Sequence, residues 1–170
     1  MKKSVVLLLL LLLCIAGQAG AVTPPWEIDG LKGAPAPAFS LADLDGRKQG
    51  LDDFSGKTVL LNFWATWCGP CRAEMPALNR LAEKYRDRGL VVVGVSVDQG
   101  PDVVIAFLKK LQVSFPVLMD SDMAVTEQYK VYAFPTTFLI DAKGTVRDFY
   151  LGEKDWEGEE FRKELEAILQ

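Results

Sequence analysis

Residues 58–81 read TVLLNFWATWCGPCRAEMPALNRL, and this stretch decides the fold. Its first part, TVLLNFW at 58–64, is a short apolar run of the kind that a strand buried on both faces shows. From residue 69 to about residue 88 the apolar side chains recur at helical spacing, so a helix follows the strand directly. Pro76 lies inside this helix and should kink it, because proline removes a backbone donor and crowds the preceding turn.

The rest of the chain continues the alternation of strands and helices. Further strands are predicted at residues 90–97, 115–120, 136–141 and 145–152, and further helices at residues 101–111, 120–129 and 156–169. Two short segments, residues 39–44 and 49–54, flank a turn and predict a small hairpin ahead of the central strand. This order predicts an α/β fold with a mixed central sheet and helices on both faces. With 170 residues and 49% apolar composition, one domain is expected.

The first 21 residues have the pattern of a secretory signal peptide. Residues 1–3 carry two lysines, residues 5–16 are apolar, and residues 19–21 are small residues that a signal peptidase accepts. The apolar run is shorter than the roughly 20 residues that cross a bilayer. We therefore expect cleavage after residue 21, with an uncleaved membrane anchor as the alternative.

The mature chain is acidic and keeps two of the three cysteines, because Cys14 leaves with the signal. Residues 22–34 are rich in Pro, Gly and Ala and lack periodicity, which predicts a linker without structure of its own ahead of a domain at 35–170. Removing Lys2 and Lys3 leaves 17 basic against 23 acidic residues, a net charge of −6. Such a surface predicts neither nucleic acid nor anionic lipid as a partner.

The chain has no histidine, which removes several mechanisms at once. A Ser-His-Asp triad, a Cys-His pair and a histidine-ligated metal site are excluded. Arg72 follows the CxxC, so the motif is not the CxxCH of haem attachment. Two thiolates alone make a poor zinc site. The sequence therefore predicts sulfur chemistry without a bound cofactor or metal.

The CxxC places its two sulfurs at the start of the predicted helix. Cys68 in the first turn faces unpaired backbone N–H groups and the positive end of the helix dipole, which stabilise a thiolate. Lowering a thiol pKa from about 8.5 to about 7 takes roughly 2 kcal/mol, which such a site can supply. Cys68 is therefore the expected attacking sulfur, and Cys71, one turn further on, resolves the mixed disulfide. A static disulfide is the alternative, but so short a loop constrains the unfolded chain little.

The phrases FWATWCGPC and FPTTFLID, with a proline five residues after the second cysteine, resemble the thioredoxin fold over about residues 35–170. The lead-in GAPAPAFSLADLDG, the phrase NFWATWCGPCRAEMP and a helix-strand insertion at about residues 99–119 are most similar to the exported TlpA/ResA-type thiol:disulfide oxidoreductases. This resemblance implies that Pro135 is cis and packs beside the disulfide. It implies that the backbone of Phe134 pairs with a substrate chain, with Thr136 beside it in the substrate-binding segment.

Two residues near the CxxC call for separate interpretation. Where thioredoxin carries a buried aspartate in the central strand, this chain has Asn62, which cannot take a proton. Glu74 lies three residues past Cys71, one turn along the same helix, and a partly buried carboxylate there could accept the Cys71 proton. Members of the resembled group carry a glutamate at the matching position. The alternative is a rim carboxylate that meets Arg72 or Arg80.

The two tryptophans around the motif have different expected roles. Trp67, beside Cys68, is expected to be exposed and to form part of a docking surface for another protein. Trp64, on the strand, is expected to lie in the core.

The function that these observations favour is an exported reductase of protein disulfides, in a bacterial periplasm or on the outer face of the cytoplasmic membrane. In an oxidising compartment it must be recharged, and the resemblance implies a membrane thiol transporter of the DsbD or CcdA kind as donor. Relatives include reductants of cytochrome c maturation. A disulfide oxidase or isomerase is the alternative. A thiol peroxidase is disfavoured because Ala65 stands where its motif has threonine, and a metal-delivery module because histidine and a Met-rich tract are missing.

Overall fold

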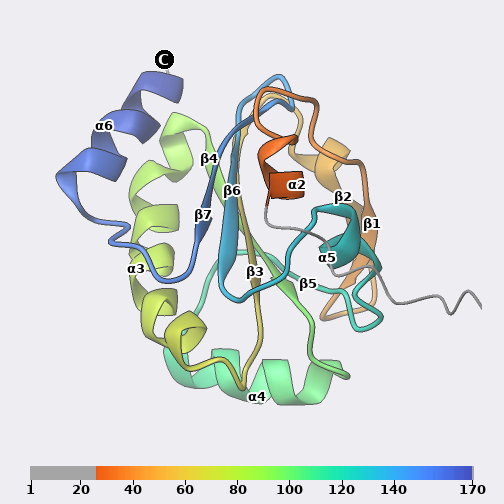
Figure 1. Cartoon of the computed structure of the whole chain (residues 1–170). Helices are drawn as coiled ribbons and strands as arrows, with labels where there is room; N and C mark the ends of the chain where they lie inside the picture. The colour runs from red at the N-terminus through yellow and green to blue at the C-terminus, as the bar shows by residue number, and fades with distance from the viewer. Residues whose placement is uncertain (1–25, 170) are drawn as a thin grey trace, which may run out of the picture.

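The computed structural model describes residues 26–169, which form a seven-stranded mixed sheet with helices on both faces (Figure 1). The strand order is β2-β1-β5-β4-β3-β6-β7. β3 is parallel to β4 and β4 to β5, whereas all the other neighbouring pairs are antiparallel. The strands are β1 (Ser40–Asp43), β2 (Lys48–Gly50), β3 (Thr58–Trp64), β4 (Leu90–Ser96), β5 (Val117–Met119), β6 (Thr136–Ile140) and β7 (Val146–Leu151).

Helices cover the two faces of the sheet unequally. Figure 1 shows α3 and α6 side by side against one face and the short α2 and α5 on the other. The buried face of α4 joins the core on the α3 side through Val104 and Leu108. The helices are α2 (Trp26–Asp29), α3 (Gly69–Tyr85), α4 (Pro101–Leu111), α5 (Ala124–Gln128) and α6 (Glu159–Ile168), with 3-10 turns η1 (Leu51–Phe54) and η2 (Arg86–Arg88). The predicted thioredoxin-like fold, with its N-terminal hairpin and its α4–β5 insertion, is confirmed.

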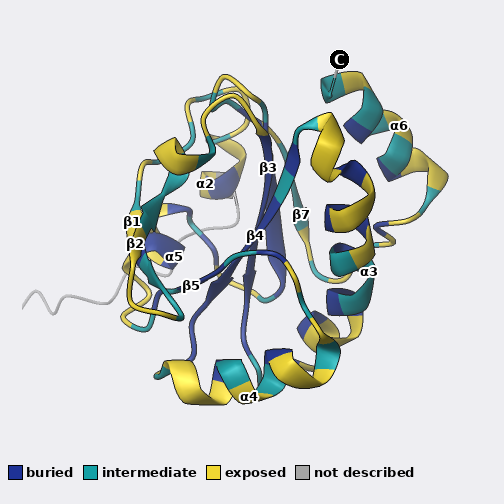
Figure 2. Cartoon of the chain, turned by 180° about the vertical axis from the view of Figure 1, so that it is seen from behind, coloured by how far each residue is buried: buried dark blue, intermediate teal, exposed yellow. Residues whose placement is uncertain are grey.

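The alternation of side chains along β3 divides the core into two layers. All seven residues of β3 are buried, and the strand is dark blue at the centre of Figure 2. Leu60 and Trp64 pack on the α3 side, whereas Leu61 and Phe63 pack on the α2 and α5 side. Because side chains alternate along a strand, Asn62 shares the face of Leu60 and Trp64. A polar amide is thereby buried beneath α3.

Several predicted elements are shorter than the sequence patterns indicate, including the strand expected at 115–120, which is β5 (Val117–Met119). The second hairpin segment forms strand only at Lys48–Gly50 and then turns into η1. The helix expected at 120–129 is reduced to α5, because the buried Asp120 accepts backbone N–H bonds from Val125 and Thr126 and fixes the chain ahead of that helix as a turn. The last helix begins at Glu159 rather than near residue 156.

The lead-in ahead of β1 is structured where the structure describes it. α2 buries Ile28, which is 1% exposed, in the core on the α5 side. Gly33 N–H donates to the carbonyl of Val146 at 2.8 Å, and Pro35 bridges to Thr145. The prediction of a linker without structure of its own is therefore wrong for residues 26–34, because an apolar side chain and backbone pairing dock them on the domain.

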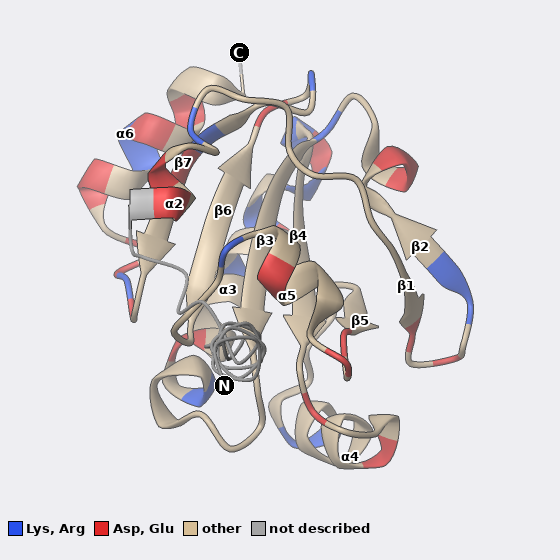
Figure 3. Ribbon diagram, turned by 45° about the vertical axis from the view of Figure 1, so that its right-hand side comes forward, with Lys and Arg blue, Asp and Glu red and all other residues tan. Residues whose placement is uncertain are grey.

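The expected signal peptide, residues 1–21, lies outside the described residues. Within residues 26–169 no helix combines the length and apolarity needed to span a bilayer. Figure 3 shows acidic segments on α2, α5 and α6 interspersed with Lys and Arg segments over the described part of the chain.

Candidate redox site

The two cysteines lie where β3 ends and α3 begins. Cys68 is the N-cap of α3, and its Sγ accepts the backbone N–H of Cys71 at 3.2 Å. The two residues form a disulfide with a Cα–Cα distance of 5.3 Å. Cys68 is 6% exposed and Cys71 is fully buried. A substrate sulfur arriving from solvent therefore reaches Cys68 and not Cys71, which is the asymmetry that the attacking and resolving roles require.

A buried carboxylate holds the loop that carries the CxxC. Asp98, which is 4% exposed and follows β4, accepts Thr66 N–H at 2.9 Å and the Thr66 hydroxyl at 2.7 Å. It also accepts the Ser96 hydroxyl at 2.8 Å. These bonds tie the residues just before Trp67 to the end of the parallel neighbour of β3. Sequence reasoning missed Asp98, although its place directly after a buried strand is a signal for a loop-positioning residue.

The cis-proline loop lies at the same end of the sheet as the disulfide. The Phe134–Pro135 peptide bond is cis, and the next residue, Thr136, pairs with Phe63 near the end of β3. The Phe134 ring meets the Trp67 ring edge to face, with centroids 5.9 Å apart. The carbonyl of Pro135 accepts the N–H of Gly152 at 2.8 Å, which fixes the loop to the end of β7.

The residues expected to bind substrate differ in their access to it. Trp67 is 65% exposed, and Leu151, opposite Thr136 on β7, is also exposed. Phe134 is half-buried. Thr136 is fully buried and donates its hydroxyl to the carbonyl of Ala133 at 2.7 Å. The expected substrate contact is therefore not available to the Thr136 side chain, which instead shapes the loop before the strand.

Glu74 is buried within a polar cluster between α3 and the sheet. It is 3% exposed. Its Oε1 accepts Asn62 Nδ2 at 2.9 Å and its Oε2 accepts the indole Nε1 of Trp156 at 2.8 Å. Burial raises the pKa of Glu74 to about 7, and the two hydrogen-bond donors hold it from rising further. A carboxyl with a pKa near neutrality can both accept and release a proton at physiological pH.

The rim alternative for Glu74 is wrong. Arg80 instead pairs with Glu157, with a shortest N–O distance of 2.6 Å. Among the described residues, Arg72 forms no ion pair with Glu74, whose two oxygens are already bonded to Asn62 and Trp156. The helical spacing turns Glu74 inward with Met75 and Leu78, both fully buried.

The sheet register explains why Asn62 reaches this cluster. Asn62 lies directly opposite Thr137 on β6, and its Nδ2 also donates to the Thr137 hydroxyl at 2.9 Å. The Asn62 Oδ1 atom is buried without a hydrogen-bond partner among the described residues. No sequence pattern singles out Thr137 or Trp156, because only the register of β6 and a contact spanning 82 residues bring them to the acid.

Within the described residues, no group of three or more Cys, His, Asp or Glu side chains is placed to hold a metal ion. The groups present at the site are thus two sulfurs, a carboxyl of raised pKa, an exposed aromatic ring and the backbone of the cis-proline loop.

A thioredoxin-like fold with a CxxC at a helix start and a cis-proline loop at the same sheet end defines a thiol:disulfide oxidoreductase. The family model described as AhpC/TSA family matches residues 32–149, and the chain belongs to this family.

Individual relatives agree with this class. The chain is 41% identical over 146 residues to thioredoxin-like protein YneN of Bacillus subtilis, across 84% of this chain and 81% of that protein. It is 39% identical over 138 residues to thiol-disulfide oxidoreductase ResA of Bacillus cereus, across 81% of this chain and 76% of that protein. A Chlorobium tepidum structure assigned as thiol:disulfide interchange protein DsbE superposes with a TM-score of 0.77 at 35% identity, across 82% of this chain and 98% of that one. The resemblance to ResA-type oxidoreductases and the enzyme class are confirmed.

Proposed function

We propose that this oxidoreductase works as an exported reductase of protein disulfides. The observation that carries the proposal is the asymmetry of the sulfur pair, with Cys68 partly accessible at the helix start and Cys71 fully buried, one helical turn before the buried Glu74. The Gly-Pro dipeptide between the cysteines matches that of reducing thioredoxins and supports this direction of electron flow.

The reaction proceeds in two sulfur exchanges. The Cys68 thiolate attacks one sulfur of a substrate disulfide, a mixed disulfide forms, and the other substrate sulfur leaves as a thiolate. Cys71 then transfers its proton to the Glu74 carboxylate, and the Cys71 thiolate attacks Cys68 Sγ. The second substrate sulfur leaves and takes up a proton. Two electrons have passed to the substrate, and the protein holds the Cys68–Cys71 disulfide.

Substrate docking uses the surface around Cys68. Trp67 and Leu151 supply exposed apolar area on two sides of the cis-proline loop. An extended substrate segment would pair with the backbone of Phe134 beside Pro135, as the family resemblance implies. This pairing uses backbone groups and not substrate side chains, so substrates of many different sequences can bind in the same way.

After each turnover a dithiol donor must reduce the Cys68–Cys71 disulfide again. The pattern of residues 1–21 supports export to a bacterial periplasm or to the outer face of the cytoplasmic membrane, with or without retained anchoring. The TlpA/ResA resemblance supports a DsbD- or CcdA-type membrane transporter as donor and cytochrome c maturation as the process served. Apocytochrome c and other exported proteins with unwanted disulfides are the substrates that this placement supports.

The reduction potential of the Cys68–Cys71 couple tests the direction of the reaction. We would equilibrate the protein in a dithiothreitol and a glutathione redox series and measure the fraction oxidised. Strongly reducing and strongly oxidising dithiols differ by roughly 150 mV, about 7 kcal/mol for two electrons. A value at the reducing end supports the reductase. A value at the oxidising end would refute it and favour the oxidase or isomerase.

Peroxidase activity and metal delivery are tested on the same preparation. The AhpC/TSA match makes peroxide reduction worth measuring, but Ala65, fully buried, stands at the motif's threonine position, so we expect only slow consumption of hydrogen peroxide. Titration of the reduced protein with Cu(I) tests the metal-delivery module, for which we expect weak binding.

A further inference from the structure

Trp156 reaches the acid of the redox site from the far end of the chain. It lies in the loop between β7 and α6, and its indole Nε1 is 2.8 Å from Glu74 Oε2. The side chain is 1% exposed. Its ring packs edge to face against Phe161 at 5.0 Å and Tyr150 at 5.5 Å between centroids. A contact across 82 residues therefore places one N–H donor on one carboxylate oxygen.

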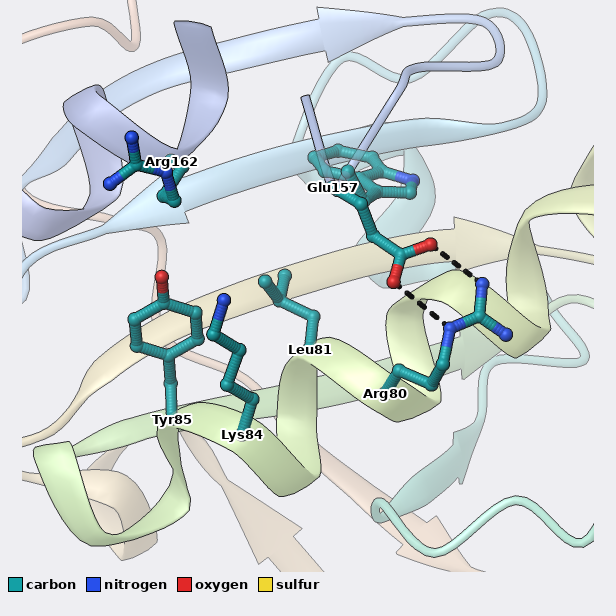
Figure 4. A pocket seen from close by; sticks show the side chains of 7 residues that line it. Arg80, Leu81, Lys84, Tyr85, Glu157 and Arg162 are labelled. Atoms are coloured by element: carbon teal, nitrogen blue, oxygen red, sulfur yellow. Dashed lines mark hydrogen bonds and ion pairs between the residues drawn. The ribbon is translucent and has the colours of Figure 1, made fainter. Parts of the chain in front are cut away.

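The loop that carries Trp156 is fastened to the same helix that carries Glu74. Glu157 accepts two hydrogen bonds from Arg80, at 3.0 Å from Nε and 2.6 Å from Nη2 (Figure 4). Arg80 follows Glu74 on α3 by six residues, so the ion pair and the buried indole contact one stretch of helix; the pair is about half exposed and contributes little, and the buried indole provides most of the attachment. The indole N–H of Trp156 and the Glu74 carboxylate are therefore held at hydrogen-bond distance by contacts between this loop and α3.

The two side-chain donors to Glu74 differ in what they do when the acid is protonated. The amide of Asn62 can turn and present Oδ1, which has no partner among the described residues, as an acceptor for a protonated carboxyl. The Thr137 hydroxyl behind it can donate as well as accept. The indole of Trp156 can only donate, and it bonds a carboxylate more strongly than a neutral carboxyl. Asn62 therefore serves both protonation states, whereas Trp156 favours the charged one.

We propose that Trp156 is a positioning residue for the redox reaction: its indole N–H favours the carboxylate form of Glu74 and keeps that side chain able to accept the Cys71 proton near neutral pH. The inference rests on the proton-accepting role proposed for Glu74. It adds that a loop remote in sequence, and not the CxxC helix alone, sets the proton affinity of the acid.

The other charged and titratable groups around Glu74 do not duplicate this role. The Lys154 backbone N–H lowers the pKa of Glu74 and the nearby Glu153 carboxylate raises it, both less than Trp156 lowers it. The Lys154 ammonium lies over the Tyr150 ring at 4.5 Å rather than on the acid. On α3 itself, Cys71 lies one helical turn before Glu74 and becomes titratable only when the disulfide is reduced.

The test is the Trp156→Phe variant, which keeps an aromatic ring and removes the N–H. We expect the pKa of Glu74, followed by the ¹³C shift of its carboxyl in the oxidised protein, to rise by about one to two units. The pH profile of the second exchange step should move in the same direction. Trp64→Phe is the matched control, because Trp64 is fully buried and its Nε1 has no partner among the described residues. It should leave the Glu74 pKa in place.

The unmutated protein provides a second test that does not depend on the variant folding. The ¹⁵N-indole signal of Trp156 should titrate with the midpoint of the Glu74 carboxyl. A flat indole signal, or an unchanged Glu74 pKa in Trp156→Phe, overturns the inference.

Comparison with Glu74→Gln separates the two proposals. If Glu74→Gln abolishes the pH dependence of the exchange step and Trp156→Phe adds nothing in that background, both proposals stand. If Glu74→Gln leaves the profile unchanged, the proton-accepting role fails and the inference fails with it. If Glu74→Gln alters the profile but Trp156→Phe alone does not, only the role of Trp156 is overturned.

Discussion

The free energy of unfolding of the native protein should fall as the pH rises past the pKa of Glu74, and replacing Glu74 by glutamine should remove this fall. Burial raises the pKa of Glu74 from 4.5 to about 7 in the folded protein. The folded state therefore binds the proton more tightly than the unfolded chain does. Stability from this group is fully present below pH 4.5 and is lost as the pH rises through 7. A pKa difference of about 2.5 between the folded and unfolded states, at about 1.4 kcal/mol per pKa unit, lowers the free energy of unfolding by about 3 kcal/mol at high pH.

The assay is equilibrium unfolding of the oxidised protein in urea at intervals from about pH 4 to about pH 9. The free energy of unfolding of Glu74→Gln, relative to the native protein, should rise by about 3 kcal/mol between the two ends of the series. Glutamine fits the site, because its carbonyl can accept from Trp156 while the Asn62 amide turns to accept from its NH₂ group. Glu83→Gln changes an exposed position on the same helix, and its free energy of unfolding should vary with pH as that of the native protein does. Parallel curves for Glu74→Gln as well would refute the reasoning.

Three further predictions concern the sulfurs, the exposed ring and the surface ion pair. Cys71→Ser should trap a Cys68 mixed disulfide with a disulfide-bonded protein, seen as a stable adduct by mass spectrometry; continued turnover at the native rate would contradict the assigned roles. Trp67→Ala should change the free energy of unfolding by no more than about 0.5 kcal/mol but lower kcat/KM several-fold for a protein disulfide and little for a small disulfide; equal losses for both would argue against docking. Glu157→Ala should lower the free energy of unfolding only slightly, because the pair with Arg80 is about half exposed and screened by solvent; urea unfolding at low and high salt checks this, and a large loss that high salt does not change would show that the loop depends on this residue.

The parts of the fold that sequence predicts well are those decided by local pattern. The run at Thr58–Trp64 is apolar throughout except for Asn62 and its first residue, and it is a buried strand. The helix Pro101–Leu111 begins at its proline, where a missing N–H does no harm, and ends where predicted. The position of Glu74 three residues past Cys71 favours a partly buried carboxyl with a raised pKa over a rim carboxylate, and the structure buries it.

The parts that sequence does not predict are decided by contacts between distant segments. The lead-in lacks periodicity, yet Ile28 finds a place in the core. The partners of Glu74 come from β3 and from the loop before α6, and no local pattern marks Trp156 as a partner of an acid 82 residues away. The place of Thr136 beside Pro135 predicts a substrate contact, but its side chain turns to its own loop. Such pairings follow from register and packing, which only the folded chain determines.

The docked lead-in holds the turn between β6 and β7 from the chain ahead of β1. Gly33 and Ala36 donate backbone bonds to Val146 and Gly144, at the turn that joins β6 to β7. The cis-proline loop precedes the other end of β6, about 17 Å away along a five-residue strand. Figure 1 agrees, with α2 set toward the end of the sheet away from the first turn of α3. Loss of the Gly33 and Ala36 bonds would therefore loosen the β6–β7 turn at the end of the sheet away from the disulfide, while leaving the cis-proline loop at the other end in place.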